Sequence, residues 1–301
     1  MTDTYMAADL PFSGSPVVPE MCDGSKTIQF QCRKGIACWN ACCSNIDISL
    51  TPYDILRLKR RLSISSSDFL LQYTVPFEME QNGIAGVKLR PVENGTACQF
   101  MTPEGCGAYE DRPTACRYYP VALLSMRRQD EYTDTNSYAL VKEDHCQGHL
   151  ERRNITINEY RKEQGVEEYD ELARGWRQLI LQKKSSGPSV GKPSKQSLQL
   201  YFMACYDLDR FRSFVTSAGF TELYELTDEE NNALLADETT LMLFGFRFLK
   251  QVLFGENTLP LRKEAADKRL ERVQQKTQQL EQEAREKRAA EADEMYGNTG
   301  E

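Results

Sequence analysis

The spacing of hydrophobic residues predicts helices over most of the chain after residue 150. Apolar side chains recur every three or four residues over 156–184, 198–215 and 239–254, which is the period of a helix with one buried face. Thr227, followed three residues later by Glu230, predicts a capping box at the start of a further helix. This part of the sequence is therefore expected to be all-helical.

The pattern between residues 27 and 150 is less regular and mixes short helices with strands. Thr51 followed by Pro52 predicts a helix start, because proline suits the first helical position. Ser67 or Asp68 is expected to cap a second, shorter helix. Near-alternating apolar residues favour strands. The expected strands are 84–91, after a turn at Asn82-Gly83, and 138–141.

These changes of pattern predict an α+β fold that is mainly helical, with a small loop-rich domain followed by an all-helical C-terminal region. A stretch rich in Ser, Gly, Pro and Lys predicts a linker between helical parts. The predicted segments are an irregular start (1–26), a cysteine-rich domain (27–150), a helix (151–184), the linker (185–197), a helical region (198–260) and a charged helical tail (261–301).

Charge and hydropathy exclude two classes of partner. The formal net charge is −8 and basic residues are interleaved with acidic ones, whereas nucleic-acid binding needs concentrated positive charge. The longest apolar stretch, 241–254, is interrupted by Arg247 and Lys250, so no membrane span is expected. Residues 1–19 lack the cationic start and apolar run of a secretory signal, which predicts a cytoplasmic location.

Cysteine is the residue type that carries the candidate chemistry. Eight of the ten cysteines lie between residues 32 and 146, and clustered thiols in a reducing compartment are typically metal ligands or catalytic groups. A disulfide framework is disfavoured on the same ground. The predicted metal ligands are Cys32, Cys38, Cys42, Cys43, Cys98, Cys106, Cys116 and Cys146. Cys22 lies outside this pattern, and Cys205 falls on the apolar face of a predicted helix.

The adjacent cysteines Cys42 and Cys43 argue against a single site with four ligands. Neighbouring side chains on a helix or a strand point in different directions, so both could reach one compact ion only through an irregular turn. Two ligand sets sharing this segment, or one polynuclear centre, are the alternatives. Zinc and a [4Fe-4S] cluster each take four thiolates, so spacing alone leaves the metal open.

Two kinds of side chain accompany the thiols. Arg112 and Arg117 flank Cys116 and are expected to bind the cofactor by offsetting thiolate charge, with a salt bridge to Glu110 or Asp111 as the equal alternative. The only histidines are His145 and His149, on either side of Cys146. Surface positions are favoured for both over metal ligation.

Several motifs together closely resemble the YkgJ family of cysteine-cluster proteins over roughly residues 28–150. They are Cys32, Cys38 and Cys42-Cys43, then Thr51-Pro52-Tyr53-Asp54-Ile55, Cys98-Gln-Phe, Gly105-Cys106 with Tyr109-Glu110, and Arg112-Pro113 with Cys116-Arg117 and Tyr119-Pro120. The resemblance implies a zinc- or iron-chelating domain. The cysteine pattern is shared with flagellin lysine N-methylases, which implies an iron–sulfur centre and use of S-adenosylmethionine.

The function expected from these observations is metal binding through the cysteine cluster, in a small domain organised by the metal. The expected metal centre is an iron–sulfur cluster of the [4Fe-4S] type, which is favoured over zinc. Redox activity is a further expectation. One alternative is an iron–sulfur-dependent protein lysine N-methyltransferase. The other is a structural zinc module whose C-terminal helices meet a protein partner. Whether the chain is an enzyme is left open.

Overall fold

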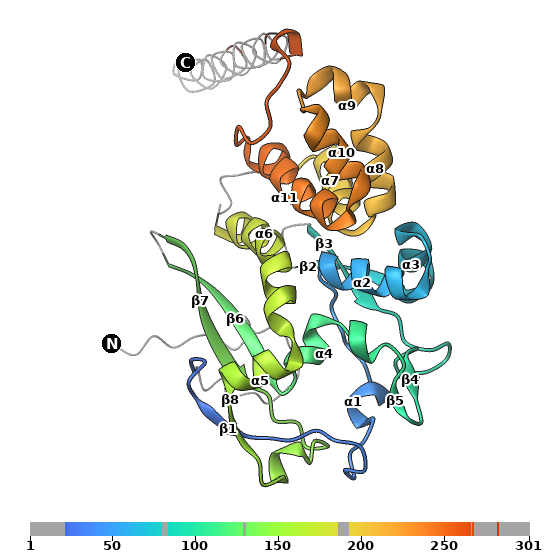
Figure 1. The fold of residues 1–301 in the computed structure, drawn as a ribbon, viewed down its shortest axis with the longest axis vertical. Coiled ribbons are helices and arrows are strands. Elements are labelled where there is room, and N and C mark those ends of the chain that lie inside the picture. The colour runs from blue at the N-terminus through green and yellow to red at the C-terminus, as the bar shows by residue number, and fades with distance from the viewer. Residues whose placement is uncertain are drawn as a thin grey trace, which may run out of the picture.

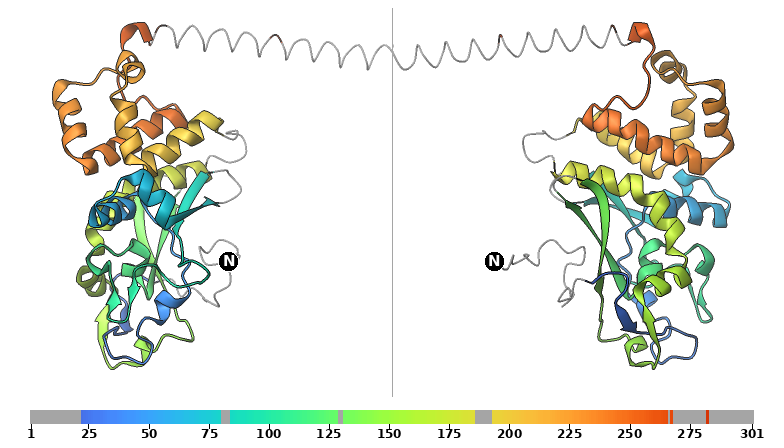
Figure 2. Two further views of the ribbon diagram at one scale, coloured as in Figure 1. Left: turned by 90° about the vertical axis from the view of Figure 1, so that its right-hand side faces the viewer. Right: turned by 60° about the vertical axis from the view of Figure 1, so that its left-hand side comes forward.

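The computed structural model describes residues 22–79, 84–128, 131–185, 193–265, 267 and 282. Figure 1 shows the C-terminal helices gathered at one end of the molecule and the cysteine-bearing loops toward the other. The two further views in Figure 2 keep this arrangement. The N-terminal segment to residue 21, most of the predicted linker and nearly all of the predicted charged tail lie outside the described residues.

The described strands form separate antiparallel pairs rather than one sheet. The pairs are β1 (Thr27–Gln29) with β8 (Asn154–Thr156), β2 (Thr74–Met79) with β3 (Ile84–Leu89), β4 (Met101–Thr102) with β5 (Gly105–Cys106), and β6 (Val121–Arg128) with β7 (Glu131–Leu140). Strand 84–91 is confirmed as β3, and 138–141 is the end of the longer β7. The turn predicted at Asn82-Gly83 lies outside the described residues.

Helices supply most of the structure, which confirms the predicted α+β, mainly helical class. The helices before residue 150 are α1 (Ala41–Ser44), α2 (Pro52–Leu62), α3 (Ser66–Tyr73) and α4 (Thr114–Tyr118), with short 3-10 turns η2 (Tyr109–Asp111) and η3 (Gly148–Leu150). The later helices are α5 (Ile157–Gln164), α6 (Val166–Ser185), α7 (Lys195–Tyr206), α8 (Leu208–Val215), α9 (Ala218–Leu223), α10 (Asp228–Ala236) and α11 (Glu238–Phe254).

Local capping chemistry sets several helix starts. Thr51 accepts from the backbone N–H of Asp54 and the Asp54 carboxylate accepts from that of Thr51, which confirms the start of α2. The capping box of Thr227 with Glu230 is confirmed at α10. The expected cap of α3 at Ser67 or Asp68 is wrong, because the Ser65 hydroxyl accepts from the Asp68 backbone N–H and the helix begins at Ser66.

Two predicted helices are each divided in two. The helix expected over 156–184 breaks at Gly165, which takes the left-handed conformation (φ 63°) that glycine adopts without strain. The helix expected over 198–215 breaks at Asp207, whose carboxylate accepts hydrogen bonds from the hydroxyls of Ser66 and Ser67. A tertiary contact thus ends α7, and the periodicity of the sequence contains no sign of it.

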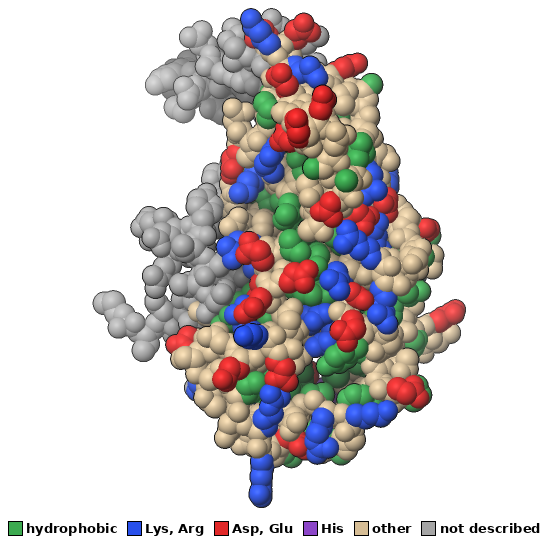
Figure 3. All heavy atoms as spheres, viewed as in Figure 1, with side chains coloured by type: hydrophobic (Ala, Val, Ile, Leu, Met, Phe, Trp, Pro, Cys, Tyr) green, Lys and Arg blue, Asp and Glu red, His purple; other side chains and the backbone are tan. Residues whose placement is uncertain are grey.

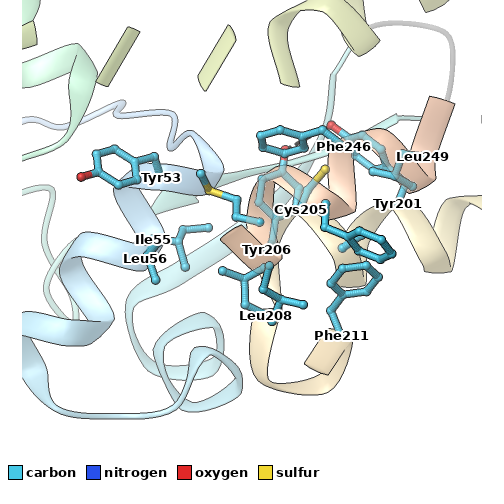
Figure 4. Packing of buried hydrophobic residues seen from close by; sticks show 14 of the residues in the cluster. Tyr53, Ile55, Leu56, Tyr201, Cys205, Tyr206, Leu208, Phe211, Phe246 and Leu249 are labelled. Atoms are coloured by element: carbon cyan, nitrogen blue, oxygen red, sulfur yellow. Dashed lines mark hydrogen bonds between the residues drawn. The ribbon is translucent and has the colours of Figure 1, made fainter. Parts of the chain in front are cut away.

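The buried apolar residues form a main core and a second core. The main core joins α2 and β3 to the C-terminal helices, and Figure 4 shows Ile55 and Leu56 of α2 on the side of the cluster that faces Tyr206 and Leu208. It crosses the boundary predicted at residue 150. Cys205 is 1% exposed within it, which confirms its predicted place in the core. The second core comprises Ile28, Phe30, Tyr118, Val121, Tyr138, Ile155, Ile157, Tyr160 and Val166.

Charges on the surface are mixed in sign. Figure 3 shows Lys and Arg side chains interleaved with Asp and Glu over the visible face. Among the described residues, no helix combines the length and apolar character required to cross a membrane.

Candidate metal centre

Cys42 and Cys43 lie on α1, a single helical turn held at the centre of the cysteine-bearing loops. The preceding Asn40 is left-handed (φ 65°), and its side-chain amide donates to the Thr102 carbonyl at 2.7 Å. That bond fixes the turn against β4, and Figure 1 shows α1 beside the β4–β5 hairpin. The Cys42 and Cys43 sulfur atoms are 3.9 Å apart.

Backbone pairing brings Cys98 and Cys106 to α1. The Cys98 N–H donates to the Cys43 carbonyl at 2.8 Å, and the Met101 N–H donates to the Cys98 carbonyl at 3.1 Å. Met101 pairs with Cys106 across the β4–β5 hairpin. Residues far apart in the sequence therefore meet on one side of α1.

A different set of contacts gathers the cysteines on the other side. The backbone N–H of Gln147, next to Cys146, donates to the Cys38 sulfur at 3.3 Å. The Gln31 N–H, next to Cys32, donates to the Gly148 carbonyl at 3.1 Å. The first and last predicted ligands are thus held around the same loop.

Asp54 positions the helix that carries Cys116. One carboxylate oxygen accepts from the backbone N–H of Thr114 at 2.8 Å and from its hydroxyl at 2.7 Å, so Asp54 holds the start of α4 as well as of α2. Asp54 is fully buried, and burial raises its pKa despite these donors. This positioning role was not predicted from the sequence. The spacing of Thr51 and Asp54 is that of a capping box, but nothing in the sequence indicates the contact of Asp54 with Thr114.

Burial, together with repulsion between neighbouring thiolates, raises the pKa of several clustered thiols. Desolvation by the surrounding protein, followed by the thiols of Cys42, Cys38 and Cys146, raises the pKa of Cys32 to about 11. Burial, followed by Cys98 and Cys106, raises the pKa of Cys116 above its usual range. Without a cation these groups hold their protons, so a metal must displace protons to bind.

Cys42 and Cys43 form a coupled pair with opposite shifts. A hydrogen bond between the two thiols lowers the pKa of Cys42 to about 7 and raises that of Cys43. Cys42 is also exposed, whereas Cys43 is half-buried. Of the two, Cys42 is the thiol that deprotonates first.

Arg117 and Arg112 are both buried, and they donate hydrogen bonds to backbone carbonyls and neighbouring side chains. Arg117 donates to the carbonyl oxygens of Arg112 and Gln164, among others, and lies 4.2 Å from the centre of the Tyr169 ring. Arg112 donates to the Tyr109 carbonyl and the Gln164 side chain. Its charge still acts on Cys32, whose pKa it lowers in opposition to burial and the neighbouring thiols.

Glu110 and Asp111, the expected salt-bridge partners of these two arginines, make other contacts. Asp111 pairs with Arg57 and Arg61 on α2, and Glu110 offers its backbone carbonyl to Arg117. Cofactor binding by Arg112 and Arg117 stays a prediction, with Arg112 the better placed of the two.

The histidines make contacts outside the thiol cluster. The His149 ring nitrogen Nε2 hydrogen-bonds to the Val141 carbonyl at 3.1 Å, and its ring packs against Phe30. His145 lies 3.5 Å from the Glu143 carboxylate. Cys22 donates to the Tyr138 carbonyl.

The donor set fits a thiophilic metal in its chemistry. The eight predicted ligands are free thiols, and Cys32 and Cys116 have other cysteines as close neighbours, whose sulfur atoms are the soft donors that zinc and iron–sulfur clusters accept. Among the described residues, no group of three or more His, Cys, Asp or Glu side chains is arranged so that it could hold a metal ion. Ligation therefore requires the thiols to turn inward from these positions.

Comparison with known proteins agrees with the motifs. Residues 31–173 match the model of the CxxCxxCC family, whose description is "putative zinc- or iron-chelating domain". The match runs past residue 150 through α5 and into α6. No curated protein and no solved structure matches the chain. The resemblance to the YkgJ-type cysteine-cluster proteins is confirmed by this family match, which covers residues 31–173.

Proposed function

We propose that this protein holds an iron–sulfur cluster through the thiolates of its cysteine cluster. The observation that carries the proposal is the kind of donors. Cys42 and Cys43 lie on α1, and backbone contacts bring further cysteines toward it, so the donors gathered here are thiols, the ligands of iron–sulfur clusters. Both histidines, which zinc sites commonly use, make their contacts elsewhere.

The surroundings of the thiols support the same proposal. Burial, followed by repulsion from neighbouring thiolates, raises the pKa of Cys32 and Cys116, and a bound cationic centre would relieve that repulsion. The shared pattern with flagellin lysine N-methylases also favours iron and sulfide over zinc. Exposed Cys32 and Cys42 place part of the centre within reach of solvent, which suits an exchange of electrons with a partner.

The test is metal analysis of the full chain purified without oxygen. We expect a brown protein with broad visible absorption, containing iron and acid-labile sulfide in equal amounts. A colourless protein with stoichiometric zinc and no sulfide would overturn the iron–sulfur assignment. Substitution of Cys22 by serine is the control, because that thiol lies outside the cluster and should leave the iron content unchanged.

A structural zinc module is the second candidate function. The observation that favours it is the dense hydrogen bonding of Asp54 and Arg117, which ties the helix carrying Cys116 to both cores. A site built this way would stabilise the fold rather than react. In that case zinc-loaded protein should be more resistant to heat than the metal-free chain, and reducing agents should leave its absorption unchanged. The protein partner expected at the C-terminal helices stays a prediction.

A further inference from the structure

We propose that Cys42 and Cys43 divide the cluster into two separate sites of four thiolates each. The first thiol set is Cys32, Cys38, Cys42 and Cys146, and the second thiol set is Cys43, Cys98, Cys106 and Cys116. This inference rests on the proposed function, because it assigns ligands to the same thiolate cluster. It would hold for either metal, since zinc and a [4Fe-4S] cluster each take four thiolates.

The two cysteines of α1 differ in their exposure, although their thiols are hydrogen-bonded to each other. Successive side chains on a helix leave the axis about 100 degrees from each other. Cys42 is exposed and Cys43 is half-buried, which agrees with that divergence. The 3.9 Å between their sulfur atoms shows that two centres here would be close neighbours.

The first thiol set is assembled by the loop that includes η3. Gln147 donates its backbone N–H to the Cys38 sulfur, and Gln31 donates to the Gly148 carbonyl. The side chain of Cys146 packs against the second core. These contacts hold Cys32, Cys38 and Cys146 together without involving the β4–β5 hairpin.

The second thiol set is assembled by that hairpin. Cys98 donates its backbone N–H to the Cys43 carbonyl, and both Cys98 and Cys106 pack against the main core. Asp54 fixes the start of α4, which carries Cys116. Cys98 and Cys106 thus pack against the main core and Cys146 against the second core, while α1 carries one member of each thiol set.

The experiment uses Cys42→Ser and Cys43→Ser, which are adjacent and therefore matched controls for each other. The full-length variants are purified without oxygen and treated with iodoacetamide under native conditions, and alkylated sites are located by mass spectrometry. We expect C42S to expose Cys32, Cys38 and Cys146 while the second thiol set stays protected. C43S should expose Cys98, Cys106 and Cys116 while the first stays protected.

Metal content provides an independent readout. Each variant should keep about half of the wild-type metal, a twofold loss, and the double variant should keep essentially none. If C42S and C43S expose the same thiols, or if either removes all the metal, one shared centre replaces the two proposed. If the wild type binds no metal, the proposed function fails first. Cys32→Ser and Cys106→Ser repeat the test away from α1, should either α1 variant fail to fold.

Discussion

The sulfur of Cys38 accepts a hydrogen bond from the backbone N–H of Gln147, 109 residues further along the chain, at 3.3 Å. An N–H directed at sulfur stabilises the thiolate form that binds metal, and such bonds also tune iron–sulfur centres. The contact joins the loop of Cys38 to the loop of Cys146, and a bond from the Cys98 N–H to the Cys43 carbonyl joins the loop of Cys98 to α1. The expected effect of metal removal on the loops depends on these two hydrogen bonds.

Metal removal should loosen the cysteine-bearing loops and spare the helices. The main core joins α2 and β3 to α7, α8 and α11, so those elements keep their packing without metal. The loops around Cys38 and Cys98 have mainly backbone contacts and thiols, and ligation is coupled to their folding. Hydrogen exchange with and without a chelator should show lost protection at Cys98 and Gln147. Equal exchange in both states would show that the metal does not hold these loops.

Asp54→Ala should destabilise the fold by about 3 kcal/mol, because three buried donors from Thr51 and Thr114 would lose their acceptor. It should also lower metal content, since α4 carries Cys116. Chemical denaturation measures the first effect, and metal analysis the second. Asp68→Ala is the matched control at the same position of α3, where the carboxylate is exposed and the expected cost is within about 0.5 kcal/mol. Equal effects of the two substitutions would contradict the positioning role of Asp54.

Metal affinity should fall as the pH is lowered. The pKa of Cys32 is about 11, and that of Cys116 is also raised, so both are protonated in the metal-free protein near neutral pH. Binding must release these protons, and each proton released weakens apparent affinity by about tenfold per pH unit of acidification. Competition between the protein and a chromophoric chelator for zinc or cobalt, on both sides of neutrality, measures the slope. An affinity independent of pH would mean that these thiols are not ligands.

Lys59→Met should weaken the attachment of the C-terminal helices to α2. Lys59 is 6% exposed, lies 2.9 Å from the Asp209 carboxylate and also pairs with Glu238. Its removal leaves the partly buried Asp209 carboxylate without this cation, while Glu238 keeps its pair with Arg60, at an expected cost of about 2 kcal/mol. Thermal or denaturant unfolding measures the change. Arg247→Gln, which removes the exposed pair with Glu230, should cost less than about 1 kcal/mol, and a similar loss in both variants would contradict this assignment.

The sequence predicted the features of the fold that depend on local chemistry. The capping boxes at Thr51 and Thr227 act within one helical turn, and the apolar period of 239–254 agrees with α11. The break at Asp207 depends on hydroxyl groups of α3 some 140 residues away, and no local pattern contains that contact. Gly165 ends α5 in the left-handed conformation, but a helix can also continue through glycine, so this residue alone does not predict the break.

The sequence predicts which thiols form the candidate site but not how they are arranged. The number and clustering of the thiols predict a group of ligands, and the adjacency of Cys42 and Cys43 favours either two ligand sets or one polynuclear centre. Which thiol meets which depends on backbone bonds such as that from Gln147 to Cys38. The role of Asp54 likewise depends on a contact with Thr114, 60 residues later.

The most direct test of the central claim compares thiol reactivity before and after metal removal. Native alkylation followed by mass spectrometry should find all eight clustered thiols protected in the protein as purified without oxygen, and reactive once the metal is removed. Cys22 should react in both states, and Cys205, 1% exposed in the main core, should react in neither. If the eight thiols react equally with and without metal, the cysteine cluster does not hold it.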